Sequence, residues 1–180
     1  MTVAQDKTGV GAGSMEWQTP PDLFAWLDQR FKFDYDAFAS HENALCDHYS
    51  TIDGTFRLFD RTVHPDNDLA EGERRPVLWH QADGLNYPWA DLSVYINPPY
   101  SRGLIEQCIQ KAYNERNNAA IIVALVPAST ETQWFQKYLL HACHIEWLPG
   151  RVLFIDPDTG EPGQSPPSGS AIAIFRQDYK

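Results

Sequence analysis

Residues 119–126 read Ala-Ala-Ile-Ile-Val-Ala-Leu-Val, and this uninterrupted apolar run constrains the fold more than any other feature of the chain. A strand with one face in water alternates apolar and polar residues, whereas a parallel strand that helices cover on both faces is apolar throughout. Pro127 ends the run, because proline has no backbone N–H for a central sheet ladder. The run therefore predicts a central parallel strand buried between two layers of helices.

The segments around this run alternate between helical and strand patterns. Thr19-Pro20-Pro21-Asp22 predicts a helix start with Thr19 as its cap, and the helix should run to about Arg30. Other helices are predicted at 104–117 and 130–141, one or two helical turns at 42–49, and strands at 32–38, 92–96, 145–148, 152–155 and 171–176, the last two paired with each other. This order predicts an α/β fold with a mostly parallel sheet and an antiparallel strand near the C-terminus.

Length and charge indicate one domain with an uneven charge distribution. A chain of 180 residues suits a single domain, expected over 16–180 after a flexible N-terminus, 1–15, with a polar excursion at about 53–81. The formal net charge of −10 argues against nucleic-acid binding, since proteins that neutralise phosphates usually carry surplus Lys and Arg. However, 16 of the 24 acidic residues but only 7 of the 14 basic ones precede Asn97, so the second half of the chain is close to neutral.

The composition predicts a soluble, cytoplasmic protein. A mean hydropathy of −0.44 and the lack of a long apolar run predict no membrane span, and residues 1–15 lack the apolar stretch of a secretory signal. Cys46, Cys108 and Cys143 are too far apart for a metal-ligand motif. We therefore expect no metal site and free thiols in a reducing compartment.

Asn97-Pro98-Pro99-Tyr100, directly after the predicted strand 92–96, is the segment most indicative of chemistry. In parallel α/β sheets, ligands bind outside the carboxyl ends of the strands, where this turn would lie. Its two prolines fix two φ angles and remove two donors, so the turn is rigid and rich in acceptors. The Asn97 oxygen and a neighbouring carbonyl could hold one amino group while Tyr100 stacks on a planar base. The alternative is an ordinary Pro-Pro loop with a packed tyrosine.

Several separated motifs extend this interpretation along the chain. They are Trp17-Gln-Thr-Pro20, Phe33-Asp-Tyr-Asp-Ala-Phe-Ala39 with Asn43-Ala44, Ile96-Asn-Pro-Pro-Tyr-Ser101, Leu125-Val-Pro-Ala-Ser-Thr130 and Gly150-Arg-Val-Leu-Phe154. Together they resemble the phage-type DNA N6-adenine methyltransferases, amino-methyltransferases with the signature (Asp/Asn/Ser)-Pro-Pro-(Tyr/Phe). The resemblance implies a Rossmann-like class I methyltransferase fold, S-adenosylmethionine as cofactor, double-stranded DNA as partner, and direct in-line methylation of a flipped adenine.

The same resemblance implies roles for single residues. Asn97 and the Pro98 carbonyl would hold the exocyclic amine, Pro99 would stiffen the turn, and Tyr100 would stack on the base. Contacts to the cofactor are implied for Trp17, Thr19, Pro20, Asp36, Ala37 and Asp83.

Other roles are open for several of the cofactor residues. Thr19 could serve only as a helix cap, Trp17 could belong to the core, Asp34 could act in place of Asp36, and Asp83 could form a simple Asp-Gly turn. The chain also departs from the family after its first strand, where Ala37-Phe-Ala-Ser40 replaces the usual Phe-x-Gly-x-Gly.

DNA contacts are expected from basic residues near the motif and in the polar excursion, namely Arg102, Arg151, Arg57, Arg61, Arg74 and Arg75. A monomer, encoded by a phage or prophage and acting in the cytoplasm of a bacterial host, is favoured. Two alternatives stay open: a methyltransferase acting on RNA or on a protein amide nitrogen, and a non-catalytic DNA-binding relative, which the missing glycine loop would suit.

Overall fold

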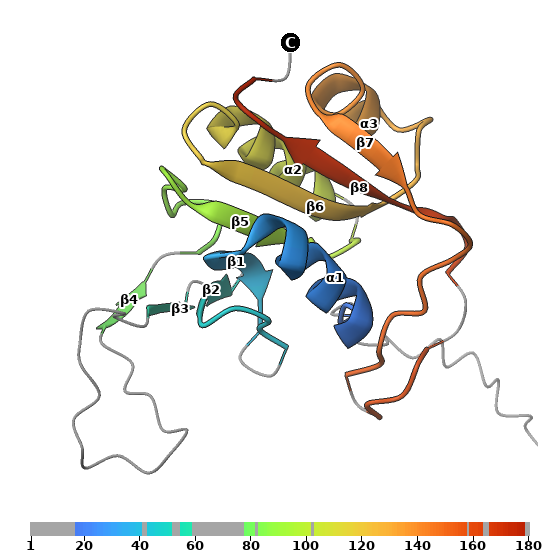
Figure 1. Cartoon of the computed structure of the whole chain (residues 1–180), viewed down its shortest axis with the longest axis horizontal. Helices are drawn as coiled ribbons and strands as arrows, with labels where there is room; N and C mark the ends of the chain where they lie inside the picture. Colours follow the sequence, from blue (N-terminus) through green and yellow to red (C-terminus); the bar gives the residue numbers. More distant parts are fainter. Residues whose placement is uncertain are drawn as a thin grey trace, which may run out of the picture.

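The computed structural model describes residues 17–40, 43–51, 55–58, 78–81, 83–101, 103–157, 159–163 and 166–178, arranged as in Figure 1. In chain order the elements are α1 (Pro21–Phe31), β1 (Tyr35–Ala39), β2 (His48–Thr51), β3 (Thr55–Leu58), β4 (Leu78–Gln81), β5 (Ser93–Ile96), α2 (Leu104–Glu115), β6 (Ile121–Pro127), α3 (Gln133–Tyr138), β7 (His144–Trp147) and β8 (Ser170–Phe175). The predicted flexible N-terminus, 1–15, lies outside the described residues. The polar excursion contributes β3 and β4 near its two ends, and its middle, 59–77, also lies outside them.

The eight described strands form one sheet in the order β4-β3-β2-β1-β5-β6-β8-β7. The neighbours β2, β1, β5 and β6 are parallel, β3 is antiparallel to β2 and β4, and β8 is antiparallel to β6 and β7. Six of these strands therefore point in one direction, and only β3 and β8 oppose them. The prediction of a mostly parallel sheet with an antiparallel strand near the C-terminus is confirmed.

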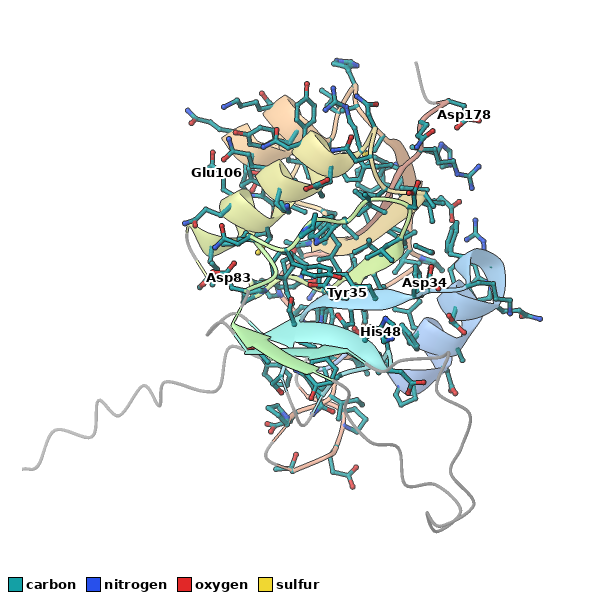
Figure 2. The ribbon with its side chains drawn as sticks, turned by 90° about the vertical axis from the view of Figure 1, so that its left-hand side faces the viewer. Asp34, Tyr35, His48, Asp83, Glu106 and Asp178 are labelled. Carbon is teal, nitrogen blue, oxygen red and sulfur yellow. The ribbon has the colours of Figure 1, made fainter. Side chains whose placement is uncertain are left out.

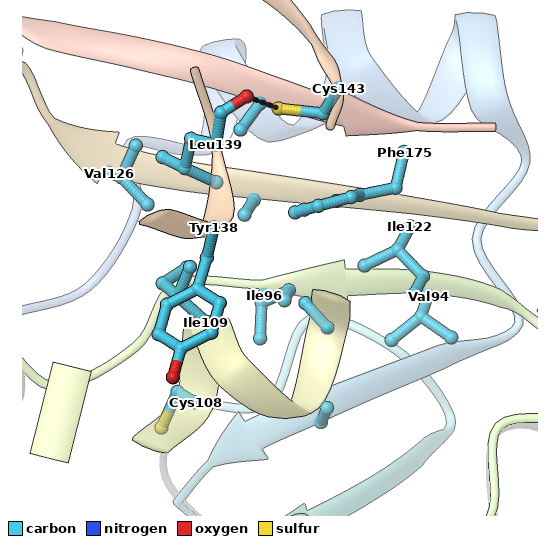
Figure 3. Close-up of a cluster of buried hydrophobic side chains, with 14 of the residues drawn as sticks. Val94, Ile96, Cys108, Ile109, Ile122, Val126, Tyr138, Leu139, Cys143 and Phe175 are labelled. Carbon is cyan, nitrogen blue, oxygen red and sulfur yellow. Dashed lines mark hydrogen bonds between the residues drawn. The ribbon is translucent and has the colours of Figure 1, made fainter. Parts of the chain in front are cut away.

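β6 comprises residues 121–126 of the apolar run together with Pro127, and it lies inside the sheet, between β5 and β8. Its side chains alternate between two cores. Ile122 and Val126 pack against α2 and α3 on one face (Figure 3), whereas Val123 and Leu125 pack on the other face with Leu27 of α1. The helices accordingly cover both faces of the sheet, α1 on one side and α2 and α3 on the other (Figure 1).

The predicted helix 104–117 is confirmed as α2, whose buried residues Ile105, Cys108, Ile109 and Ala112 recur at helical spacing. The predicted helix 130–141 is shorter in the structure, over Gln133–Tyr138. Its start is delayed because the Thr132 hydroxyl donates to the Ser129 carbonyl at 2.7 Å and closes a turn there.

The predicted cap of α1 is wrong. Pro20 occupies the N-cap position, and no side chain caps the helix. The Thr19 side chain instead turns into the core, where its Oγ1 lies 2.7 Å from the Tyr95 hydroxyl oxygen of β5. A buried tyrosine hydroxyl needs a hydrogen-bond partner, and this need takes Thr19 away from the helix.

Two further assignments need correction, one helical and one a strand. The helical turns predicted at 42–49 are wrong in the part that the structure describes: residues 43–47 form no helix, and His48–Thr51 form β2, whose buried Tyr49, Ser50 and Thr51 lie beside β1 in parallel. Residues 152–155 do not pair with β8, since β6 and β7 already occupy both of its edges. Ile155 instead forms isolated bridges with Gln18 and Pro162.

Candidate active site at the carboxyl edge of the sheet

The turn Asn97–Tyr100 connects the carboxyl end of β5 to the start of α2. It follows Ile96, which lies opposite Ala124 of β6, and leads to Ser101, whose carbonyl accepts from Leu104 N at 3.2 Å. Pro98 is buried. The turn is thus anchored by a central strand on one side and by the first turn of a helix on the other, at the edge where α/β sheets bind ligands.

The Asn97 amide is oriented by the backbone of the N-terminal segment. Its Nδ2 donates to the carbonyl of Trp17 at 2.9 Å. Because a carbonyl can only accept, the amide nitrogen must face Trp17 and Oδ1 must face away from it. No described residue donates to Asn97 Oδ1 or to the Pro98 carbonyl, so the turn presents two acceptors.

The Tyr100 ring is held in place at its hydroxyl group. Its hydroxyl donates to the Leu125 carbonyl of β6 over a long 3.4 Å, and desolvation raises the pKa of this hydroxyl above its ordinary value. The ring meets Phe154 edge to face, with 5.8 Å between centroids. Tyr100 as a whole residue is 37% exposed.

Trp17 lies beside the turn and not in the core, since it is 38% exposed. Its indole packs on Gly163, where a Cβ atom would come within 2.1 Å of the ring. The following residue, Gln18, exchanges two backbone hydrogen bonds with Ile155 at 3.0 and 2.9 Å. These contacts fix the carbonyl that holds Asn97.

A buried polar cluster lies between α1 and the sheet. Asp36 of β1 is 4% exposed and sits level with Tyr95 of β5, which bonds to Thr19. Burial raises the pKa of the Asp36 carboxyl to about 7, although the backbone N–H groups of Leu45 and Phe38 partly offset that rise. A cationic neighbour would stabilise the ionised form of this carboxyl and lower its pKa.

Asp34 lies at the other end of β1. Its carboxylate accepts from Ser93 N at 3.1 Å and its own N–H donates to the Ser93 carbonyl at 2.8 Å, so it joins the amino ends of β1 and β5. Figure 2 shows Asp34 and Asp83 on opposite sides of Tyr35. The structure therefore brings Asp36, not Asp34, toward the edge that carries Asn97.

The carboxyl end of β1 is covered by the turn that starts at Asp83. Both Asp83 carboxylate oxygens accept from Asn86, at 2.8 Å from its backbone N and 3.0 Å from its Nδ2. Gly84 then lies directly on β1, because a Cβ there would be 1.9 Å from the Ala37 carbonyl oxygen and 2.8 Å from Ser50 Oγ. Gly84 thus brings the backbone of the 83–87 turn into close contact with the backbone of β1.

Of the six predicted DNA-binding arginines, the structure describes the side chain of Arg151. It is exposed and has no hydrogen-bond or ion-pair partner among the described residues. It follows Gly150, which has a positive φ of 70°, and precedes Phe154, which contacts Tyr100. Arg57 lies on β3 with its side chain outside the described residues, as are Arg102, Arg61, Arg74 and Arg75 in full.

Sequence reasoning missed four residues that shape this site: Tyr95, Phe154, Gly84 and Gly163. Phe154 closes the motif Gly150-Arg-Val-Leu-Phe154, so a signal for it was present in the sequence. The other three act through contacts with residues far away in the chain, and no local pattern marks them.

The described part of the chain holds neither a metal-binding cluster nor a membrane-spanning helix. It contains no group of three or more His, Cys, Asp or Glu side chains that could hold a metal ion. No helix in it is both long and apolar enough to cross a membrane.

The sheet and the Asn97–Tyr100 turn define an α/β protein with a candidate ligand site at the carboxyl edge of its strands. The family model described as DNA N-6-adenine-methyltransferase (Dam) matches residues 11–60 and 52–180, and the chain belongs to this family. A DNA N-6-adenine-methyltransferase of Escherichia phage T1 is 27% identical over 178 residues, covering 89% of this chain and 62% of the phage protein. The chain thus spans less than two thirds of that relative's length.

Proposed function

We propose that the protein methylates the exocyclic amine of adenine in double-stranded DNA, using S-adenosylmethionine and a base flipped out of the duplex. Family membership supports the reaction class. The observation that carries the proposal is the orientation of Asn97, whose Nδ2 is engaged by the Trp17 carbonyl so that Oδ1 is left to accept. The phage relative supports a phage- or prophage-encoded protein that acts in a bacterial cytoplasm.

The two acceptors of the turn suit an amino group with two N–H donors. Asn97 Oδ1 and the Pro98 carbonyl would each accept one of them. The nitrogen lone pair of adenine is normally delocalised into the ring, and acceptors that favour a more tetrahedral nitrogen localise it and stabilise the positive charge that develops there. Because two prolines and α2 fix the turn, these acceptors need no rearrangement during the reaction. Tyr100 would stack on the base.

The residues near β1 fit a cationic cofactor. When bound, S-adenosylmethionine supplies a methyl group activated on a positively charged sulfur. Asp36 would hold its methionine amino group or ribose, because a buried carboxyl with a pKa raised to about 7 is stabilised in its ionised form by a cation or by added donors. Trp17, Thr19, Pro20, Ala37 and Asp83 stay proposed contacts, with Asp83 also committed to its turn.

The strand arrangement supports a Rossmann-like class I methyltransferase fold. Four parallel strands, β2-β1-β5-β6, carry helices on both faces, and the antiparallel β8 enters between β6 and β7. Such an order leaves the carboxyl ends of β1 and β5 adjacent, so that a cofactor at β1 and a base at the turn after β5 would meet.

Transfer of tritium from labelled cofactor to DNA tests the proposal. We expect label in duplex DNA, and none in an otherwise identical duplex whose adenines are replaced by purine without the amino group. RNA and total protein, offered in parallel, test the alternative substrates. A non-catalytic relative would show no heat on calorimetric titration with S-adenosylmethionine, which would contradict the proposal.

Asp36 gives a pH-dependent stability prediction. The pKa of an aspartate is about 3.9 in an unfolded chain but about 7 at Asp36 in the folded protein. The folded state therefore binds this proton more tightly, and the carboxyl lowers the free energy of unfolding as pH rises from about 4 to about 7. Asp36→Asn should stabilise the cofactor-free protein by on the order of a few kcal/mol at pH about 8, and by less at pH about 4.5.

Urea unfolding at the two pH values measures this difference. Asp22→Asn, on the exposed first turn of α1, controls for the loss of one negative charge. A gain in stability that is equal at both pH values would contradict the argument. Cofactor affinity should fall in Asp36→Asn, because the ionised carboxyl is lost.

The Arg151 side chain should contribute to DNA affinity by contacting a phosphate of the DNA backbone. Arg151→Glu is expected to raise the KM for DNA about 10-fold at low salt and to reduce the salt dependence of binding by roughly one phosphate. Arg176→Glu is the matched control, because Arg176 is also exposed but follows β8 at the opposite edge of the sheet. Equal losses in both variants would show a non-specific charge effect and exclude a local contact at Arg151.

A further inference from the structure

The described residues 154–157 and 159–163, here called the 154–163 hairpin, lie against the Asn97–Tyr100 turn, although the proposed chemistry does not use them. Backbone hydrogen bonds fold the hairpin back on itself, from Asp156 N to the Glu161 carbonyl at 2.9 Å and from Gly163 N to the Phe154 carbonyl at 2.8 Å. At its start, Phe154 packs edge to face on Tyr100. The hairpin therefore already supports one end of the turn.

A single peptide group connects the 154–163 hairpin to the Asn97 end of the turn. The Gln18 N–H donates to the Ile155 carbonyl at 3.0 Å, and the carbonyl of the same peptide group, that of Trp17, accepts from Asn97 Nδ2 at 2.9 Å. The peptide unit is planar and rigid, so a shift at Ile155 or Trp17 moves the acceptor that orients Asn97.

Gly163 provides the seat for the Trp17 ring. A Cβ built on Gly163 would lie 2.1 Å from Trp17 Cζ3 and 2.5 Å from Cη2, closer than any real contact. The φ of Gly163 is not in the left-handed region, so glycine is required here by the indole and not by the backbone conformation. Any larger residue must displace the ring, the chain that carries it, or the hairpin.

We propose that Gly163 is a positioning residue for the transfer reaction: it seats the Trp17 indole so that the Trp17–Gln18 peptide group holds the Asn97 amide with Oδ1 toward the base. This inference rests on the proposed function of Asn97. In this proposal the 154–163 hairpin sets the orientation of the Asn97 side-chain oxygen, and Gly163 itself contacts neither substrate.

Gly163→Ala tests this directly. We expect the transfer rate constant at saturating substrates to fall about 10- to 100-fold, as misplacement of a reacting group by about 1 Å does. Gly169→Ala is the matched control, since its Cβ would make only ordinary contacts, 3.8 Å from the Gly150 carbonyl oxygen and 4.0 Å from Ala128 Cβ. In a Trp17→Leu background, Gly163→Ala should cause no further loss, because the clashing ring is absent.

The side-chain amide signals of Asn97 in a ¹⁵N–¹H spectrum give a readout that does not depend on activity. They are assigned as the pair that disappears in Asn97→Asp. The pair should move in Gly163→Ala and stay in place in Gly169→Ala. If the Trp17 indole signal moves in Gly163→Ala while the Asn97 pair does not, the inference is wrong.

If Gly163→Ala does not fold, the double variant Trp17→Leu/Gly163→Ala must fold, since the clash is gone, and its failure would overturn the inference. If the unmodified protein transfers no methyl group to DNA but the Asn97 pair responds as expected, the proposed function fails while the positioning by Gly163 holds.

Discussion

Asn97→Ala is expected to lower the rate of methyl transfer to duplex DNA by about 10²–10³-fold, the usual cost of losing one preorganised hydrogen-bonding group at a reacting centre. The variant removes one of two acceptors for the adenine amine and frees the Trp17 carbonyl, which now holds Asn97 Nδ2 at 2.9 Å. Affinity for S-adenosylmethionine should be largely retained, because Asp36 and its surroundings are unchanged. Single-turnover transfer and calorimetry measure the two effects separately.

Asn97→Asp separates the two roles of the side chain. An aspartate keeps an acceptor for the amine but, when ionised, cannot donate to the Trp17 carbonyl, so we expect a rate between those of the wild type and of Asn97→Ala. Asn114→Ala, on the exposed face of α2, is the control for replacing an asparagine. A loss of cofactor affinity in Asn97→Ala as large as that in Asp36→Ala would contradict the assigned roles.

Gly84→Ala should cause the largest loss of stability among the glycine substitutions in the described chain. The added Cβ would lie 1.9 Å from the Ala37 carbonyl oxygen, 2.8 Å from Phe38 Cε1 and 2.8 Å from Ser50 Oγ. The closest obstacle is backbone inside the sheet, which cannot swing aside as a side chain can. We expect a decrease of about 3 kcal/mol or more in the free energy of unfolding, the upper part of the range for overpacking.

Denaturant unfolding of Gly84→Ala beside Gly169→Ala measures that cost. The control adds the same methyl group at 3.8 Å or more from its neighbours and should be nearly neutral. Because small domains are stable by only about 5–15 kcal/mol, Gly84→Ala should also unfold at a clearly lower temperature. Equal stability of the two variants would mean that the 83–87 turn moves off β1 without cost.

The sequence was most informative where one property decides the structure of a segment. Residues 121–126 of the apolar run lie in the buried strand β6, and the periodic residues from Leu104 onward form α2. Likewise, Asn97-Pro98-Pro99-Tyr100 follows a strand and lies at the carboxyl edge, as its prolines predict. In these segments, local pattern and tertiary environment favour the same structure.

Local reasoning failed where a distant partner determines the structure. Thr19 has the sequence of a helix cap, but the Tyr95 hydroxyl, 76 residues away, takes its side chain. Residues 48–51 became β2 because β1 offered them an open edge, and residues 152–155 lost their strand because β8 had no free edge to pair with. Such competition for partners is a property of the complete sheet.

The same reason limits prediction of the candidate site. The motif identified Asn97, but its orientation depends on Trp17, 80 residues earlier, and on a glycine in a segment that looked like an unpatterned loop. The missing glycine loop after β1 was a departure that the sequence could not explain. In the structure, close approach to that strand end is made by Gly84, which comes from a different turn.

The link from Ile155 through the Trp17–Gln18 peptide group to Asn97 also has a consequence for biosynthesis. Its contacts join residues 17–18, 97 and 155, so the turn can be translated and the central strands can pair long before its amide acquires a fixed orientation. Contacts between residues so far apart in the sequence carry a large loop-closure cost, which slows their formation. We expect a nascent chain that ends before residue 163 to carry the whole Asn-Pro-Pro-Tyr sequence without the Gly163 seat for the Trp17 ring, and therefore without the contact that we propose orients Asn97.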